Sequence, residues 1–300
     1  RAERRHTRND YDNAEDWLRY CHESGLPPWD DEDDFGWRYP AGTGPFSDRA
    51  RAVFGHSERQ YALAWEGFGA SSFLSLAQFK QAYAGVALAN YRGRLLDSHL
   101  TVTWSTLGYT DHHSILSRQK RLLELFRKWF QHRGCWPAWL WVLEDSKKRG
   151  LHTHILISIP NGLRDEFNAY VAKAIRTVCD NQEPITKAAE KTALLTGGGV
   201  PSVERQWLLF KYVFKGLDPQ ARVRNYCTNW ANVPLGDFAN IRMREQGEVL
   251  VKRMGLSRDL DAAAQAAWQV SGGPPVLADL SKGGLFSDRF YQWFLQNRGD

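Results

Sequence analysis

The stretch Trp139–Ile159, WLWVLEDSKKRGLHTHILISI, decides the fold because it contains two β-rich runs joined by a turn. The runs Trp139–Glu144 and Leu151–Ile159 are dominated by large apolar and β-branched residues, whereas residues 145–150 between them are polar and end in Gly150. Two such runs joined by a short segment that contains glycine predict an antiparallel hairpin with a basic turn.

The segments on either side of the hairpin extend it into an α+β fold. Upstream, alternating apolar residues predict a strand within 95–107, and apolar residues at helical spacing predict a helix over 116–131. Downstream, helices are expected over 162–180 and 203–217. This order of elements favours a central antiparallel sheet with helices packed on one side of it.

We divide the chain into three regions. Residues 98–235 are the expected core, and residues 1–97 are a mostly helical N-terminal region without a recognisable motif, with helices expected near 11–22, 48–66 and 75–89. Residues 236–300 are a basic C-terminal region with helix-like stretches near 258–269 and 287–297. The sheet is therefore expected to carry helical extensions at both ends of the chain.

Composition narrows the class of protein. The chain has 300 residues, a formal net charge of +5, and 13 Trp, 11 Tyr and 15 Phe beside 39 Lys and Arg. Aromatic and basic residues together are typical of proteins that stack bases and hold phosphates, although an aromatic-rich core accounts for most of these residues. The four cysteines are widely spaced, so neither a zinc knuckle nor a disulfide framework is indicated. With no long apolar run, we expect a cytoplasmic protein without a membrane partner.

Two histidines in the second run of the hairpin predict a metal site. Alternate strand residues share a face, so His152 and His154 project from the same side, about 6–7 Å apart. If the hairpin places Glu144 opposite His152, the carboxylate completes a mixed nitrogen and oxygen ligand set that suits Mg²⁺ or Mn²⁺. Asp145 is the alternative third ligand.

A tyrosine on the helix expected over 203–217 is the candidate nucleophile. Tyr212 falls nearly opposite the apolar stripe of this helix, so it faces solvent or a second surface, and Lys215 is its neighbour one turn later. A phenol with a pKa of about 10 is a weak nucleophile at neutral pH. A metal ion at the phosphate and a nearby ammonium group together make its attack feasible. The stripe consists of Trp207, Phe210, Phe214 and Leu217.

Three motifs, His99–Trp104, Leu151–Ile157 and Tyr212–Lys215, resemble those of the HUH endonuclease superfamily of replication initiators, relaxases and transposases. The resemblance covers residues 98 to about 218. Thr153 departs from the hydrophobic residue that most members have between the two histidines. A single tyrosine in the third motif is similar to the single-tyrosine initiators of rolling-circle replication, although Tyr226 is close in sequence.

The resemblance implies a metal-dependent nick in single-stranded DNA, a covalent 5′-phosphotyrosine on Tyr212, a free 3′-hydroxyl and later rejoining of the strand. The implied partner is single-stranded or hairpin origin DNA. Gly197–Gly199 is not followed by the Lys and Ser or Thr of a phosphate-binding loop, so a host helicase and a polymerase are expected as further partners.

Candidate DNA-binding residues are basic or aromatic side chains near these motifs. Trp136 is a candidate for base stacking, whereas Trp139 and Trp141 share a strand face and fit a core better. The basic candidates for phosphate contacts are Lys147, Lys148, Arg149, Lys211, Arg222 and Arg224.

Other classes explain the sequence less well. An amidohydrolase needs further histidines downstream, but all nine lie at or before His154. The paired His-x-Thr/Ser motifs of a 2H phosphoesterase and the Gly-x-Ser-x-Gly of a serine hydrolase are missing. A relaxase or transposase of the same superfamily, and a catalytically silent nucleic-acid-binding protein, are the alternatives left open.

Overall fold

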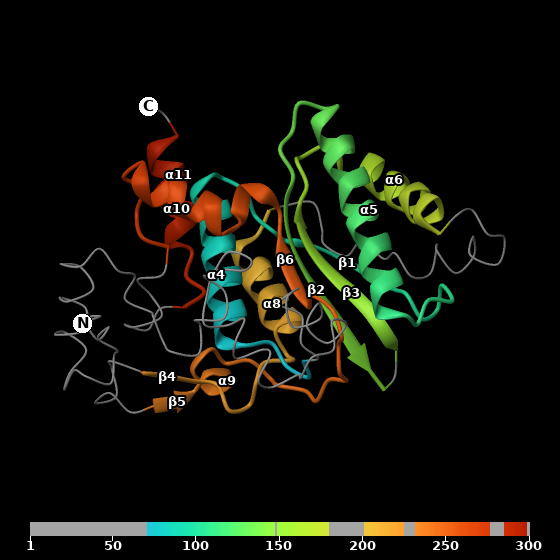
Figure 1. Cartoon of the computed structure of the whole chain (residues 1–300). Helices are drawn as coiled ribbons and strands as arrows, with labels where there is room; N and C mark the ends of the chain where they lie inside the picture. The colour runs from blue at the N-terminus through green and yellow to red at the C-terminus, as the bar shows by residue number, and fades with distance from the viewer. Residues whose placement is uncertain (1–70, 148, 180–200, 225–231, 277–284, 299–300) are drawn as a thin grey trace, which may run out of the picture. The chain divides into compact units, whose positions relative to one another are not determined.

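The computed structural model describes residues 71–147, 149–179, 201–224, 232–276 and 285–298 (Figure 1). These residues belong to one compact unit, 70–300. The helices expected near 11–22 and 48–66 lie outside the described residues. Elements from all three regions assigned from the sequence occur in this unit, so the boundaries at residues 97 and 235 do not separate compact parts of it.

A four-stranded antiparallel sheet forms the centre of the unit, as expected for the α+β class. Its strands lie in the order β1 (Ser98–Thr103), β3 (Gly150–Ser158), β2 (Ala138–Ser146) and β6 (Met254–Leu256). Every neighbouring pair is antiparallel. β6 comes from the C-terminal region and was not expected from the sequence.

The β2–β3 hairpin has the register on which the metal prediction depends. Glu144 lies opposite His152, and the pairing continues to Ser146 and Gly150 at the turn. Gly150 has a φ of 60°, a conformation that glycine adopts without the steric cost of a side chain. The strands therefore pair up to Ser146 and Gly150, so the register of the hairpin is kept to its end.

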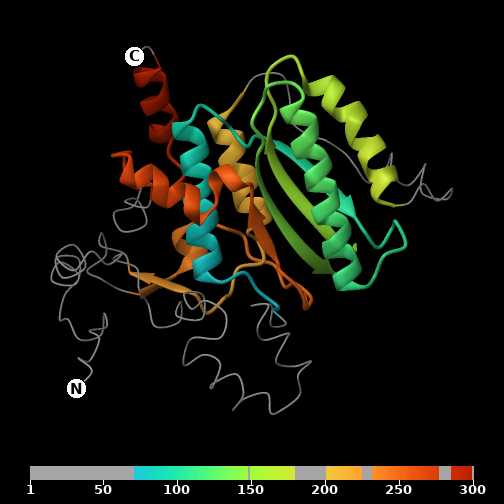
Figure 2. The same cartoon turned by 45° about the horizontal axis from the view of Figure 1, so that its top comes forward.

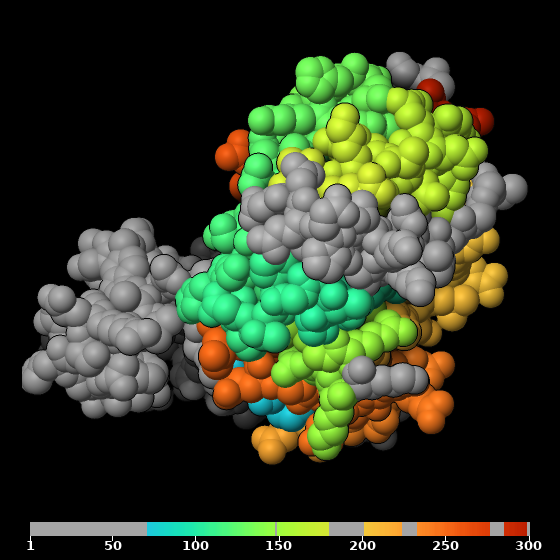
Figure 3. All heavy atoms as spheres, turned by 90° about the vertical axis from the view of Figure 1, so that its right-hand side faces the viewer, coloured from blue at the N-terminus to red at the C-terminus, as the bar shows by residue number. Residues whose placement is uncertain are grey.

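Two helices cover one face of the sheet. They are α5 (His112–Gln131), whose first turn is capped by Asp111, and α6 (Arg164–Val178). In Figure 3 the green atoms of α5 and the yellow-green atoms of α6 lie together on the outside of this face. The core beneath is apolar, and Thr153 projects into it, where its hydroxyl accepts a hydrogen bond from Trp104 Nε1 (2.8 Å) and donates one to Gln119.

Two further helices, α4 (Leu76–Tyr91) and α8 (Val203–Val213), cover the opposite face (Figures 1 and 2). The expectation of helices on one side only is therefore wrong. α4 is buried on most of its circumference, as a helix between a sheet and other helices must be. Gly85 permits this close packing, because a Cβ there would lie 2.8 Å from the Leu256 side chain and 2.9 Å from the Leu260 carbonyl oxygen.

The C-terminal residues complete the covering of α4. α10 (Ala262–Val270) and α11 (Arg289–Asn297) both contact it, and the 3₁₀ turn η3 (Arg258–Leu260) follows β6. A separate two-stranded sheet consists of β4 (Arg222–Arg224) and β5 (Asn232–Pro234), followed by α9 (Leu235–Phe238). Among the described helices, none combines the length and the apolar character needed to cross a membrane.

Candidate metal and tyrosine site

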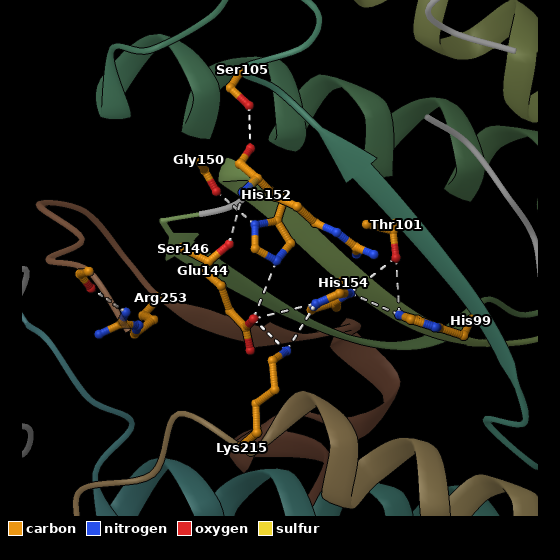
Figure 4. A network of polar contacts seen from close by, with 12 residues as sticks. His99, Thr101, Ser105, Glu144, Ser146, Gly150, His152, His154, Lys215 and Arg253 are labelled. Carbon is orange, nitrogen blue, oxygen red and sulfur yellow. Dashed lines mark hydrogen bonds and ion pairs between the residues drawn. The ribbon is translucent and has the colours of Figure 1, made fainter. Parts of the chain in front are cut away.

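Three side chains on β2 and β3 converge on one point of the face that α8 covers. His152 and His154 alternate along β3, and Glu144 comes from the opposite position on β2. Figure 4 shows the three side chains pointing toward one another. Their exposed fractions are 1% for Glu144, 2% for His152 and 0% for His154, and one ligand atom from each lies within 4.8 Å of the others.

Asp145, the alternative third ligand, is not part of this group. It pairs with Leu151, so its position on the strand is one residue away from the face that carries the histidines. The choice between the two carboxylates follows from the period of two along a strand, once the register is known.

Lys215 brings a positive charge into the cluster. Its Nζ lies 2.6 Å from Glu144 Oε2 and 3.3 Å from His154 Nε2 (Figure 4). The residue follows the end of α8 and is only 7% exposed. Its Nζ also lies 4.2 Å from the centre of the Tyr212 ring, so the expected proximity to Tyr212 is confirmed, but the ammonium group is directed at Glu144 as well.

The far nitrogens of both imidazoles are already engaged. His152 Nδ1 lies 2.8 Å from the carbonyl oxygen of Gly150, to which it can only donate. His154 Nδ1 lies 2.9 Å from His99 Nε2 and 3.1 Å from Thr101 Oγ1. With the protons on Nδ1, both Nε2 atoms present lone pairs to Glu144, which is the tautomer that metal-binding histidines adopt.

The acceptor atoms converge on one point, and Lys215 Nζ, 2.6 Å from Glu144 Oε2, is the positive charge that lies among them in this structure. The Nε2 atoms of His152 and His154 each lie 3.4 Å from Glu144 Oε2, a separation at which acceptor atoms repel unless a positive charge offsets them. Glu144 Oε1 is buried and has no hydrogen-bond partner among the described residues. The Glu144–His152–His154 group can therefore hold a metal ion, as the sequence predicted.

The charge states suit ligation at neutral pH. Burial lowers the pKa of His154 to about 4, assisted by the positive charge of Lys215, and burial beside His154 lowers the pKa of His99 to about 3. Burial acts to raise the pKa of Glu144, but its two histidine neighbours and Lys215 outweigh this and hold the pKa well below its usual range. Burial also lowers the pKa of Lys215, against the attraction of Glu144. Both histidines named here are neutral and Glu144 is ionised at pH 7.

Tyr212 borders this cluster from α8. Its ring centre lies 5.2 Å from that of His154 and 5.6 Å from that of His99, and its side chain is 38% exposed. Its predicted position opposite the apolar stripe is confirmed, because all four stripe residues are buried. The phenol ring is thus in contact both with His154, one of the candidate ligands, and with solvent.

The basic residues predicted to bind DNA differ in their exposure and in the groups that they contact. Arg149 is exposed in the hairpin turn, and its positive charge adds to burial, the main cause, in lowering the pKa of His99 and of Lys215. Lys147 forms an ion pair with Glu245 at 3.6 Å, and Lys211 lies over the Phe286 ring at 4.6 Å. The remaining candidates are Arg222, exposed on β4, Arg224 on the same strand, and Lys148, which lies outside the described residues. Tyr226, the second tyrosine near the third motif, also lies outside them.

Three residues near the site were not assigned a role from the sequence. His99 and Thr101 lie on the same face of β1, and the alternation of side chains along a strand could have indicated this from the sequence. Only the pairing of β1 with β3, however, brings the two residues to His154. Arg253 is 2% exposed, donates to the carbonyl oxygens of Ser71 and Gly247, and has a pKa lowered to about 10 by burial. It ties the segments at Ser71 and Gly247 to the chain just before β6.

The chain matches no known family model, no characterised protein and no solved structure in comparisons at significant similarity. The function must therefore be argued from the site itself.

Proposed function

We propose that this protein is a metal-dependent, HUH-type single-strand DNA endonuclease and strand transferase that initiates rolling-circle replication. The observation that supports this most is the position of Tyr212, which contacts His154 of a buried Glu-His-His group while its side chain stays 38% exposed. A purely structural tyrosine has no need of such a neighbour. The proposed partners are single-stranded or hairpin origin DNA, with a host helicase and polymerase acting after the nick.

Glu144, His152 and His154 would hold the ion, which we propose to be Mg²⁺ or Mn²⁺ because the set combines imidazole nitrogens with a carboxylate. A divalent ion bound there withdraws charge from the oxygens of the scissile phosphate. His99 and Thr101 hold the His154 ring through its far nitrogen, and the Gly150 carbonyl does the same for His152. Such contacts orient the ligands and fix their tautomers.

Tyr212 is the proposed nucleophile. Its hydroxyl loses a proton, its oxygen forms a bond to phosphorus, and the bond from phosphorus to the 3′-oxygen breaks, after which that oxygen takes up a proton. Lys215, with Nζ 4.2 Å from the ring, would offset negative charge on the phosphate, and Arg149, exposed in the hairpin turn, is the proposed second phosphate contact. One phosphodiester is exchanged for another, so the reverse reaction can rejoin the strand without a nucleotide cofactor.

The reaction is tested by incubating the protein with labelled single-stranded oligonucleotides from candidate origins, with Mn²⁺ or with EDTA. We expect a protein-linked DNA species on a denaturing gel that requires Mn²⁺ and disappears in Tyr212→Phe. Tyr170→Phe is the matched control, because Tyr170 lies on α6 across the sheet. Tight, metal-independent DNA binding without any adduct would instead indicate a silent nucleic-acid-binding protein.

The attachment point can be read from peptides. Trypsin cleaves after Lys211 and Lys215, so DNA on Tyr212 appears on the four-residue peptide 212–215, whereas DNA on Tyr226 would appear on peptide 225–242. An adduct on 225–242 would move the nucleophile to Tyr226. The assignment to replication rather than conjugation or transposition follows from which DNA sequence is cut.

Metal binding is tested separately by titrating Mn²⁺ into the protein in a calorimeter. We expect His154→Ala and Glu144→Ala each to weaken binding by more than about tenfold, because each removes a direct ligand. Asp145→Asn is the matched control, since it changes the neighbouring carboxylate that the group does not include. Equal affinity in His154→Ala and the wild type would place the ion elsewhere.

A further inference from the structure

A second candidate site lies at the other end of the sheet face that carries the metal cluster. A cleft of about 340 Å³ opens where β1 and β2 begin and β3 ends. This volume is at the lower end of the range for small-ligand pockets. Its lining includes Arg94, Asp97, Trp136, Asn161 and Pro201.

The alternation of side chains along β3 places the cleft and the metal cluster on the same face of the sheet. Ser158, which lines the cleft, follows His154 by four residues on β3, so the two side chains share a face and lie about 13 Å apart. Asp97 stands two residues before His99 at the start of β1. His99 lies between the two sites along β1, in contact with both His154 and Tyr212.

Helix α8 connects the same two places. At its N-terminal end, the backbone N–H of Ser202 donates to Asp97 in the cleft at 3.1 Å. Tyr212 is ten residues further on, about 15 Å along a helix. The cleft and the tyrosine are therefore held at a fixed separation by a rigid element.

The lining has the chemistry of a nucleobase site. Trp136 is 62% exposed, and its carbonyl oxygen accepts a hydrogen bond from Arg94 Nη1 at 2.8 Å, which fixes the short segment before β2. An indole presented at the mouth of a small cleft offers a surface on which a base can stack. Asp97 and Asn161 add groups that can hydrogen-bond to the edge of a base.

Burial has opposite effects on the two charged groups of the cleft. It lowers the pKa of Arg94 and raises the pKa of Asp97. Both groups are thus partly removed from water, where a hydrogen bond to a ligand is stronger than at an open surface.

We infer that this cleft binds one unpaired nucleobase of single-stranded DNA, stacked on Trp136, in the strand whose phosphate reaches Tyr212. The second half of this statement rests on the proposed nuclease function, whereas binding of the base does not. Double-stranded DNA cannot use the cleft, because its bases are stacked within the duplex.

The test measures DNA binding in EDTA, so that no cleavage contributes. The probe is a fluorescein-labelled oligodeoxythymidine of about 20 nucleotides, longer than the footprint of a typical single-strand-binding module. A strand of equal length with abasic residues in place of the bases is the second probe. The proteins are the wild type, Trp136→Ala, Trp136→Phe and the control Val270→Ala, which removes an exposed apolar side chain from the end of α10.

We expect Trp136→Ala to weaken binding of the thymidine strand about tenfold, within the range for loss of one stacked base. Trp136→Phe retains a ring and loses less, Val270→Ala binds as the wild type does, and the abasic strand binds equally to all four proteins. Unchanged thymidine affinity in Trp136→Ala would overturn the inference, as would an equal loss for the abasic strand. If Trp136→Ala weakens binding of the thymidine strand but not of the abasic strand, and the wild type forms no adduct on Tyr212, the cleft binds a base but the protein is not the proposed nuclease.

Discussion

The two faces of the sheet differ in where they admit polar residues. The face under α5 and α6 is mostly apolar, and Thr153, the polar residue between the two histidines, has hydrogen-bond partners in Trp104 and Gln119. The face under α4 and α8 is apolar only around Leu140, Val142 and Leu156. Toward the hairpin turn, just past the end of α8, it carries the Glu-His-His cluster.

The two faces therefore differ in what they contribute to the protein. One face buries apolar side chains and stabilises the fold, whereas part of the other face buries charges that cost free energy unless they are paired or bind a cation. Substitutions on the apolar face should therefore change the free energy of unfolding without changing metal affinity. Substitutions in the cluster should change both quantities.

The largest effect on stability is expected from the apolar face. Phe126 is fully buried on α5 and packs against Phe167 with ring centres 5.1 Å apart. Phe126→Ala should lower the free energy of unfolding in urea by about 3–5 kcal/mol while leaving Mn²⁺ affinity of the folded protein unchanged. Leu208→Ala, at a residue that is 59% exposed, is the control and should change little. A large loss of Mn²⁺ affinity in Phe126→Ala would show that the two faces are not independent.

The next effect concerns the buried charge of Glu144. Lys215→Met removes the ammonium group 2.6 Å from its carboxylate, which should cost about 3 kcal/mol of unfolding free energy in EDTA. Saturating Mn²⁺ should restore more stability to this variant than it adds to the wild type, because the ion replaces the lost charge. The double variant Glu144→Gln/Lys215→Met should recover most of the loss without metal. If Lys215→Met is as stable as the wild type in EDTA, Glu144 does not need a neighbouring cation.

The pH dependence of the unfolding free energy provides a further test of the polar face, through His154. Because the pKa of His154 is about 4 in the folded protein and near 6.5 in an unfolded chain, the unfolded state takes up the proton first as the pH falls. Stability from this residue is complete above about pH 6.5 and is lost between there and pH 4, amounting to about 2 kcal/mol at pH 5. Urea unfolding in EDTA at pH 7 and pH 5 measures it, and His154→Ala should show a smaller drop. An equal drop in the variant would assign the acid sensitivity to other groups.

The smallest effect tests the polar residue of the apolar face. Thr153→Val keeps the shape of the side chain but removes the partner of Trp104 Nε1 and of Gln119, which should cost about 1–2 kcal/mol. Mn²⁺ affinity should fall by less than threefold, since the hydroxyl points away from the cluster. A loss comparable to that of His154→Ala would mean that Thr153 positions the histidines.

Several features of the site could be predicted from the sequence because they depend on local periodicity. The alternation of side chains along β3 placed both histidines on one face, and the helical stripe placed Tyr212 outside the core, whereas the hairpin register that selects Glu144 over Asp145 was only assumed and is confirmed by the structure. Each of these follows from residues that are close together in the chain.

Features that depend on distant pairing could not be predicted. β6 has only three residues, Met254–Leu256, and is recognisable as a strand because it pairs with β2. α4 was assigned to a separate region because its sequence does not reveal what it packs against, and the sheet therefore seemed covered on one side. The helix expected to reach residue 217 ends at Val213, and this early end turns Lys215 inward to Glu144.

The hairpin register makes the site an all-or-none property of the folded chain. A slip of one residue between β2 and β3 would move Glu144 out of step with His152, so the three ligand atoms would not be slightly farther apart but would fail to meet. The pairing of β2 with β3 continues to Ser146 and Gly150, so the register of the ligand positions is the register of the whole hairpin. If the group binds a metal ion, that binding would report that the sheet has formed in its correct alignment, because a misaligned hairpin would leave no site for the ion.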